Sequence, residues 1–226
     1  MKTMLATLAL AAAVGLAGAA QAQPLQVVEL FTSQGCSSCP PADAAVAAIS
    51  KRPEILALSF GVTYWDDLGW KDTFGQKKFT ERQWDYARGL RHNQVATPQV
   101  VVNGRTDVVG QDPREIDAAI ARVRLTAGPG VALSQGSTTV SGAAPARAAV
   151  VWLVRYNPAV QQVQVRRGEN TGKTLPIKNA VAELTRLGDW NGGTKTYALP
   201  AAPAGLSTAI LVQAGPGGPI LAAAKG

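Results

Sequence analysis

Cys36 and Cys39 are separated by two residues in the stretch FTSQGCSSCPPAD, and the 226-residue chain contains no other cysteine. Thiols at this spacing can close a short disulfide that a third thiolate attacks and exchanges. A static crosslink in so small a loop would restrict little unfolded-chain entropy, so its structural benefit is small. The spacing therefore favours thiol–disulfide exchange, in which Cys36 attacks as the thiolate and Cys39 resolves the mixed disulfide.

Metal binding is the competing chemistry for this cysteine pair. The chain has one histidine, His92, and its two methionines, Met1 and Met4, fall in the N-terminal leader described below. A closed zinc site needs four ligands, whereas two cysteines and one histidine supply three. Soft Cu(I) sites often recruit a thioether, which the mature chain would lack. We therefore expect no metal site and no cofactor besides the redox-active disulfide, with a Cu(I) carrier as an alternative.

Residues 1–22 read MKTMLATLALAAAVGLAGAAQA and have the character of a secretory signal peptide. One lysine precedes a short apolar run, and the stretch ends in a small-x-small pattern that is typical of a cleavage site near Ala22. No later stretch approaches the roughly 20 apolar residues of a membrane-spanning helix. The sequence predicts a periplasmic or secreted protein that does not span the membrane. An oxidising compartment of this kind allows a disulfide to persist.

Strands and helices alternate on both sides of the cysteine pair. The predicted elements are strands at 25–31 and 54–60, helices at 40–50, at 76–91 and from Pro113, and a hairpin at 99–110. This order predicts an α/β fold in which helices cover a central sheet. It places Cys36 at the start of a helix, where unpaired N–H groups and the helix dipole favour a thiolate. We expect Cys36 to be the more exposed cysteine and its pKa to lie below the usual value of ~8.5.

A change in composition divides the mature chain. Residues 23–125 carry twelve basic and twelve acidic side chains, whereas residues 131–226 carry nine basic and three acidic ones, so the second half has a net charge of +6. Turn-forming glycine and proline residues lie between the two halves. We predict an α/β domain at 23–126, a linker at 127–130 and a basic β-rich domain at 131–226.

The second half has the pattern of a small antiparallel β-sandwich. Strand-like runs at 148–156, 160–167, 206–215 and 219–226 alternate with turn residues, while the pattern of 178–190 fits helix or strand. The basic excess is consistent with attraction to an anionic envelope surface or an acidic protein. The alternative is a surface whose charges only keep the protein soluble. A nucleic-acid partner is not expected in this compartment.

The order strand, Cys-x-x-Cys, helix, strand, helix, Thr97-Pro98, hairpin and last helix resembles the thioredoxin superfamily. The resemblance implies that the bond before Pro98 is cis, that Pro98 faces the cysteines, and that the backbone at Thr97 offers an extended edge to a polypeptide substrate. It also implies a buried acid that assists deprotonation of the second cysteine. Glu29 is the candidate, either in that role or as an edge-strand acid that faces water.

Trp65 and Asp66 follow the second predicted strand, at the sheet end where thioredoxin-like sites lie, and are further candidates for substrate binding. Seven of the thirteen aromatic residues of the chain lie within residues 64–86, and most of them are expected to pack locally. Asp66, Asp67 and Asp72 are expected to be solvated loop acids.

A closer resemblance extends over nearly the whole mature chain. The blocks ELFTSQGCSSCPPAD, YWDDLGWKD, TPQVVVNGR and RRGENTG, in this order, are similar to those of a secreted bacterial family known as domain of unknown function 1223, which has a thioredoxin-like fold. The chain departs from the family pattern before Tyr64, where Gly61-Val62-Thr63 replaces His-Val-Asp. Any metal-binding or proton-relay role of that histidine and acid in relatives would be lost here.

These features predict a thiol–disulfide oxidoreductase that exchanges disulfides with protein substrates and with a redox partner of unknown identity. The predicted catalytic residues are Cys36, Cys39 and Glu29, and the predicted substrate-binding residues are Thr97, Pro98, Trp65 and Asp66. A non-catalytic envelope scaffold with a structural disulfide is the alternative from a different functional class.

Overall fold

The computed structural model describes residues 24–226, and the signal peptide predicted at 1–22 lies outside the described residues. The helices are α1 (Pro40–Ile49), the short 3-10 helix η1 (Asp66–Leu68), α2 (Lys77–Leu90) and α3 (Pro113–Arg122). The strands are β1 (Gln26–Thr32), β2 (Ile55–Gly61), β3 (Gln99–Val102), β4 (Thr106–Val108), β5 (Gly130–Ser134), β6 (Ser137–Gly142), β7 (Ala149–Asn157), β8 (Gln161–Gln164), β9 (Thr174–Ile177), β10 (Ala180–Trp190), β11 (Gly193–Ala198), β12 (Ser207–Gln213) and β13 (Ile220–Lys225). Within this part of the chain, no helix has the length and apolar character needed to cross a membrane.

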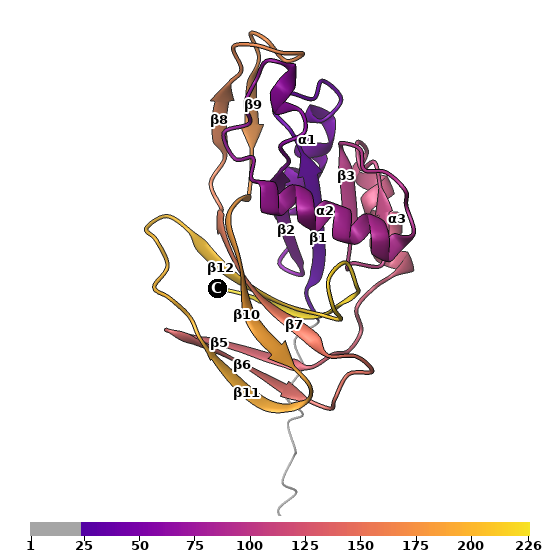
Figure 1. Ribbon diagram of the computed structural model, residues 1–226, viewed down its shortest axis with the longest axis vertical. Coiled ribbons are helices and arrows are strands. Elements are labelled where there is room, and N and C mark those ends of the chain that lie inside the picture. Colours follow the sequence, from indigo (N-terminus) through magenta and orange to yellow (C-terminus); the bar gives the residue numbers. More distant parts are fainter. Residues whose placement is uncertain (1–23) are drawn as a thin grey trace, which may run out of the picture.

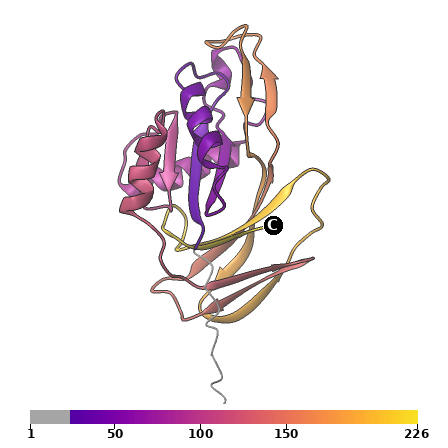
Figure 2. The same cartoon turned by 180° about the vertical axis from the view of Figure 1, so that it is seen from behind.

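An eight-stranded mixed sheet forms the centre of the molecule, in the order β13-β12-β7-β10-β2-β1-β3-β4. β1 pairs with β2 in the parallel direction and with β3 in the antiparallel direction. The apolar sides of α1 and α3 pack on one face of the first-half strands, and α2 packs on the other face (Figures 1 and 2). The predicted α/β architecture, a sheet covered by helices, is confirmed.

β1 and β2 are buried on both faces because helices cover each side of them. All seven residues of each strand are buried, which explains why their sequences are continuous apolar runs rather than alternating ones. Along β1, Val28 and Leu30 pack with α1 and α3, whereas Val27 and Phe31 belong to the core on the α2 side. The C-terminal end of β1 leads directly into the loop that holds Cys36 and Cys39.

The predicted linker at 127–130 does not separate two sheets. β7, β10, β12 and β13 come from the second half of the chain and extend the sheet of the first half. At the junction, Ala180 of β10 pairs in parallel with Ser59 of β2, and the Asn179 side chain donates to the Ala57 carbonyl at 2.8 Å. The predicted division therefore needs correction at the level of the sheet, because composition and turn residues do not report the pairing of distant strands.

A smaller antiparallel sheet, β11-β6-β5, packs against the second-half part of the main sheet. Val140 and Tyr197 of the small sheet share a buried cluster with Val151 and Leu153 of β7 and with Trp190 of β10. Two packed β layers are therefore present in this part of the molecule. The segment 178–190, whose pattern fits helix or strand, is the strand β10 over most of its length.

β8 and β9 pair only with each other and form a separate antiparallel hairpin. The hairpin leaves the other second-half strands and runs beside α1 (Figures 1 and 2). Val165, Leu175 and Ile177 from this segment pack with Trp70 and Phe74 of the loop before α2. The hairpin therefore carries a second-half segment to the part of the molecule that holds the cysteines.

The basic excess of the second half does not lie entirely on the surface. Arg155 is buried, and its guanidinium donates to the Thr208 hydroxyl. Lys225 donates to the Ile55 carbonyl at 2.7 Å. Part of the positive charge therefore serves contacts within the fold.

Candidate functional site

The cysteine loop connects the end of β1 with the start of α1. Cys39 immediately precedes Pro40, the first residue of α1, and the Cys36 N–H donates to the Ser33 carbonyl at 3.1 Å. Both cysteines are free thiols, and both are fully buried. The prediction that Cys36 is the more exposed cysteine is therefore wrong, because the surrounding loops cover both sulfur atoms.

The two thiols lie in environments that shift their pKa values in opposite directions. The Cys36 sulfur lies 3.2 Å from Ser38 Oγ and 3.7 Å from the Thr97 carbonyl oxygen. A hydrogen bond from the Cys39 thiol is the largest cause that lowers the pKa of Cys36 to about 6, and burial opposes it only in part. Burial raises the pKa of Cys39 well above its usual range, and the bond to Cys36 raises it further. A nucleophile and a resolving thiol require this contrast.

The segment Thr97–Pro98 lies against the cysteine loop, and its peptide bond is cis. The Thr97 hydroxyl accepts a hydrogen bond from the Trp65 indole N–H at 2.7 Å. Tyr64, which is 36% exposed, lies in the same region. Its partial burial raises its pKa to about 12, and the charges of both cysteines add to the rise. The structure thus places Thr97 and Trp65 beside Cys36 and adds Tyr64, which the sequence pattern did not single out.

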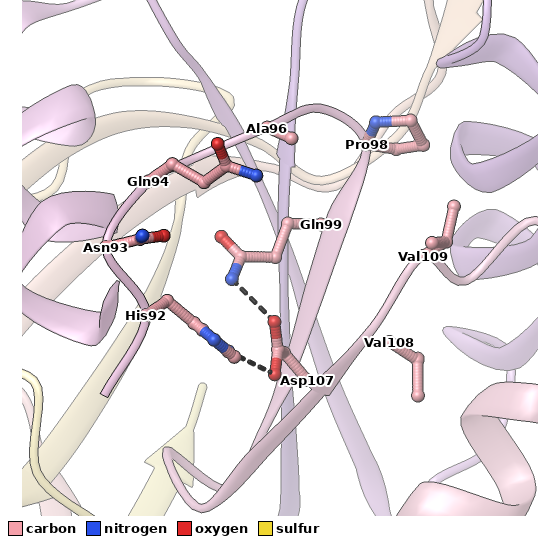
Figure 3. Close-up of a pocket in the computed structure, with 9 residues that line it drawn as sticks. All are labelled: His92, Asn93, Gln94, Ala96, Pro98, Gln99, Asp107, Val108 and Val109. Carbon is pink, nitrogen blue, oxygen red and sulfur yellow. Dashed lines mark hydrogen bonds and ion pairs between the residues drawn. The ribbon is translucent and has the colours of Figure 1, made fainter. Parts of the chain in front are cut away.

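An open pocket of about 330 Å³ lies against Pro98 (Figure 3). His92 and Gln99 point toward Asp107 in this pocket: His92 Nε2 lies 3.0 Å from Asp107 Oδ1, and Gln99 Nε2 donates to Asp107 Oδ2 at 2.8 Å. Val109, which is 53% exposed, adds an apolar surface. The pocket therefore combines a hydrogen-bonded polar group with apolar side chains next to the Thr97–Pro98 segment.

Glu29 is not bonded to either thiol. It is fully buried on β1, where its carboxylate accepts hydrogen bonds from Arg82 Nε at 2.8 Å and from the Tyr86 hydroxyl. Arg82 also donates to Gln213 Oε1 at 3.2 Å. The interpretation of Glu29 as an edge-strand acid that faces water is wrong, because β1 is an interior strand. The residue is buried, as the thioredoxin resemblance implies, but its carboxylate is bound by α2. Its observed role is a buried ion pair between β1 and α2.

Asp43 is a second buried acid without a hydrogen bond to either thiol, but it lies close enough to Cys36 to be affected by its charge. It is 7% exposed, and its Oδ1 atom has no hydrogen-bond partner. Burial raises the pKa of Asp43 to about 8, and the charges of Asp72 and Cys36 add to the rise. The sequence contains a signal for this residue, because positions four residues apart, such as Cys39 and Asp43, are neighbours on a helix.

Asp66 and Asp72 shape the loop that follows β2. Asp66 Oδ1 accepts the Asp72 N–H at 3.0 Å, and the Asp72 carboxylate accepts the N–H groups of Gln34 and Phe74, each at 2.8 Å. Burial raises the pKa of Asp72 to about 6. The prediction that Asp72 is a solvated loop acid is wrong, because it binds backbone donors, one of them in the cysteine loop. The hydrogen bonds of Asp66 lie within its own loop.

The tip of the β8–β9 hairpin also contacts the cysteine loop. Asn170 Nδ2 donates to the carbonyl oxygens of Gln34 and Cys36 at 3.0 and 2.8 Å. Glu169 Oε2 accepts the Ser37 N–H at 2.9 Å. Asn170 and Glu169 belong to the block RRGENTG, to which spacing and composition assign no role.

Between residues 24 and 226, no group of three or more His, Cys, Asp or Glu side chains could hold a metal ion. The His92 ring bonds Asp107.

Residues 27–213 match the family described as "Protein of unknown function (DUF1223)". This range includes the cysteine loop, the Thr97–Pro98 segment and the hairpin tip. The chain belongs to the DUF1223 family. The DUF1223 match continues from the first half through β12, so both halves of the sheet belong to one family unit. No match was found among curated proteins.

Two solved structures resemble this DUF1223 protein. The X-ray crystal structure of protein AGR_C_4864 from Agrobacterium tumefaciens matches with a TM-score of 0.74 and 33% identity, covering 91% of this chain and 95% of that chain. HBP35 of Porphyromonas gingivalis matches in fold, with a TM-score of 0.62 and 14% identity, covering 90% of this chain and 75% of that chain. The arrangement of both halves is therefore found in a second protein at substantial identity.

Proposed function

We propose that this DUF1223 protein is a thiol–disulfide oxidoreductase with a thioredoxin-like fold that acts on protein substrates outside the cytoplasm. The contrast between the two thiols carries the proposal, because Cys36 is favoured as a thiolate while Cys39 is favoured as a thiol. A static disulfide does not require a difference between the pKa values of its two thiols. The predicted secretory leader supports a compartment in which disulfides persist.

In the reductive direction, the Cys36 thiolate attacks one sulfur of a substrate disulfide. A bond forms between Cys36 and that sulfur, the substrate S–S bond breaks, and the other substrate sulfur leaves as a thiolate that takes a proton from solvent. Cys39 then gives its proton to Asp43 and attacks Cys36, which closes the Cys36–Cys39 disulfide and releases the second substrate thiolate. Two electrons pass to the substrate, and the reverse sequence oxidises a substrate dithiol.

Asp43 suits the role of proton acceptor because its pKa of about 8 is close to the working pH. The negative charge of Cys36 contributes to that raised pKa. Once Cys36 is in the mixed disulfide it has no charge, so Asp43 is easier to ionise at the step in which it must accept a proton.

The segment Thr97–Pro98 is the proposed docking edge for an extended substrate backbone. The Trp65 indole, through its hydrogen bond to Thr97, holds this edge in place. The pocket that contains His92 and Asp107 would receive a substrate side chain near the reacting cysteine (Figure 3).

A measured reduction potential tests the proposed function. Mature protein is equilibrated with defined thiol–disulfide buffers, and the oxidised fraction is counted by alkylation and mass spectrometry. A value between about −120 and −270 mV is expected, since exchange-active proteins lie in this range. A value below about −300 mV is typical of a structural disulfide and would contradict the proposal.

Alkylation of Cys36 tests its acidity. In reduced Cys39→Ser protein, the iodoacetamide reaction rate is expected to rise with pH through a midpoint near 6, because the serine hydroxyl can replace the hydrogen bond that most lowers the Cys36 pKa. Cys39→Ala lacks this donor and is the matched control, with a midpoint shifted to higher pH. A midpoint at or above ~8.5 in Cys39→Ser would mean that Cys36 is an ordinary thiol.

Asp43→Asn is expected to slow exchange at pH 7 by roughly tenfold or more while it stabilises the fold. The pKa of Asp43 rises from 3.8 to about 8 on burial, so the folded state holds this proton more tightly than the unfolded state. The wild-type protein therefore loses stability as pH rises from about 4 to about 8, whereas the asparagine variant is spared this loss.

Urea unfolding at pH 5, 7 and 9 measures this difference. The stability gained by Asp43→Asn should grow with pH, and Asp67→Asn, at an exposed position, should show no such trend. A gain that does not depend on pH, together with an unchanged exchange rate, would remove Asp43 from the mechanism.

A further inference from the structure

We propose that Asn170, at the tip of the β8–β9 hairpin, is a positioning residue for Cys36, so that the hairpin is a working part of the redox site. The inference rests on the proposed role of Cys36 as the nucleophile. Asn170 comes from the opposite half of the chain, 134 positions from Cys36. Its side chain is fully buried although it is polar.

The hydrogen bonds of Asn170 account for its burial. Both donor bonds of its amide go to the cysteine loop, to the Gln34 carbonyl at 3.0 Å and to the Cys36 carbonyl at 2.8 Å. Its Oδ1 atom accepts from Lys173 Nζ at 2.9 Å. These two carbonyls flank Gly35, which lies between β1 and α1 where no strand ladder fixes the backbone. One side chain therefore holds the backbone on each side of the residue before Cys36.

The hairpin is itself anchored firmly enough to act as a support. Leu175 and Ile177 pack with Trp70 and Phe74, and the Trp70 indole donates to Gln34 Oε1 at 3.0 Å. The tip is closed by its own backbone bonds, including Lys173 N–H to the Asn170 carbonyl at 3.0 Å. The hairpin therefore contacts the cysteine loop in two ways, through the packed side chain of Trp70 and through Asn170.

The position of the Cys36 sulfur depends on this support. The sulfur must stay near Ser38 Oγ and the Thr97 carbonyl, at 3.2 and 3.7 Å, because these groups form part of its hydrogen-bonding environment. If the Asn170 amide is removed, two buried carbonyls lose a donor and the loop can shift. The thiolate then loses hydrogen bonds, and Cys36 becomes a weaker nucleophile at neutral pH.

Several titratable groups surround Cys36 and enter any pH profile of its reactivity. They are Cys39 and Asp43 near the start of α1, Tyr64 and Asp72 in the loop after β2, and Glu169 on the hairpin. Glu169 carries a negative charge, whereas Asn170 is neutral. Glu169 is an exposed acid whose removal takes a negative charge away from the cysteine loop, so its loss cannot disfavour the Cys36 thiolate by charge.

The test compares Asn170→Ala and Asn170→Asp with Glu169→Ala as the matched control, each in the reduced full-length mature chain with Cys39→Ser. The readout is the pH profile of iodoacetamide alkylation at Cys36. Asn170→Ala is expected to move the midpoint upward, with a fall of about threefold or more in alkylation rate at pH 6. Asn170→Asp keeps the shape of the residue but cannot donate to two carbonyls, and should shift the midpoint at least as far. Glu169→Ala should leave it unchanged or move it downward.

An unchanged midpoint in folded Asn170→Ala would overturn the proposal, as would an equal upward shift in Glu169→Ala. If Asn170→Ala does not fold, Lys173→Met replaces it, because this change removes the partner of Asn170 Oδ1 at an exposed position. Arg167→Met, which removes an exposed positive charge from the same hairpin tip, is its control for the lost charge and should give a smaller shift. A smaller upward shift is expected from Lys173→Met, and no shift would overturn the proposal. The alkylation profile does not depend on turnover, so a shifted midpoint in a protein with a potential below about −300 mV would refute the oxidoreductase and leave the positioning role standing.

Discussion

Replacement of Cys36 by serine is expected to abolish disulfide exchange, with a loss of at least roughly 100-fold relative to the wild-type protein. The serine hydroxyl is not ionised at neutral pH and forms no disulfide, so the first bond of the proposed reaction cannot form. Cys39→Ser is expected to behave differently. It keeps the nucleophile and loses the resolving thiol, so it should accumulate a mixed disulfide with a substrate protein.

Reduction of a disulfide-bonded reporter protein measures the rate, and intact-mass spectrometry detects the mixed disulfide. Ser37→Ala is the matched control, because it alters an exposed side chain of the same loop and leaves both thiols. Exchange that survives in Cys36→Ser would assign the nucleophile to Cys39. Loss of activity in both cysteine variants with no trapped species would favour a structural disulfide over catalysis.

The largest effect on stability is expected from Arg82→Met, which should lower the free energy of unfolding by about 3–5 kcal/mol. The side chains of Arg82 and Glu29 are 5% and 0% exposed. Water therefore cannot solvate the charge that remains when its partner is removed. The Tyr86 hydroxyl would remain as a donor to Glu29 but carries no compensating charge. Urea unfolding of wild type and variant at pH 7 measures the loss.

A double-mutant cycle separates the energy of the Glu29–Arg82 ion pair from the effect of changing the shape of each side chain. Glu29→Leu should destabilise by a similar amount, and Glu29→Leu with Arg82→Met should destabilise by much less than the sum, because no buried charge is left unpaired. Additive losses would show that the two residues stabilise the fold independently. In the folded double variant, exchange activity should persist, which distinguishes a structural Glu29 from a proton shuttle.

Local patterns predicted the first half well because each signal is carried by neighbouring residues. The apolar run before Thr32 is the fully buried β1, and the proline pair after Cys39 begins α1. The Asp112 side chain accepts the Arg114 N–H at 2.9 Å at the start of α3, which is the cap that an aspartate before a first-turn proline favours. None of these features depends on a distant part of the chain.

Contacts between distant residues account for what the sequence did not show. The partner of Glu29, Arg82, is 53 positions away, and nothing in the strand pattern indicates a buried base on the facing helix. Asn170 lies in a block without obvious periodicity, and its contact with Cys36 exists only because the hairpin runs back along α1. The burial of Asp43 depends likewise on packing around α1.

The contact of β10 with β2, at Ala180 and Ser59, also covers part of the β2 edge that could otherwise pair with another chain. β2 reads ILALSFG, with neither charge nor proline to discourage pairing with another chain, and an open edge of such a strand is a template for aggregation. A fragment that ends before residue 130 would expose this edge. During synthesis the same exposure exists, since Ala180 of β10 is made about 120 residues after its partner Ser59. We therefore expect this part of the β2 edge to stay open in the nascent chain until residues beyond Ala180 have been added.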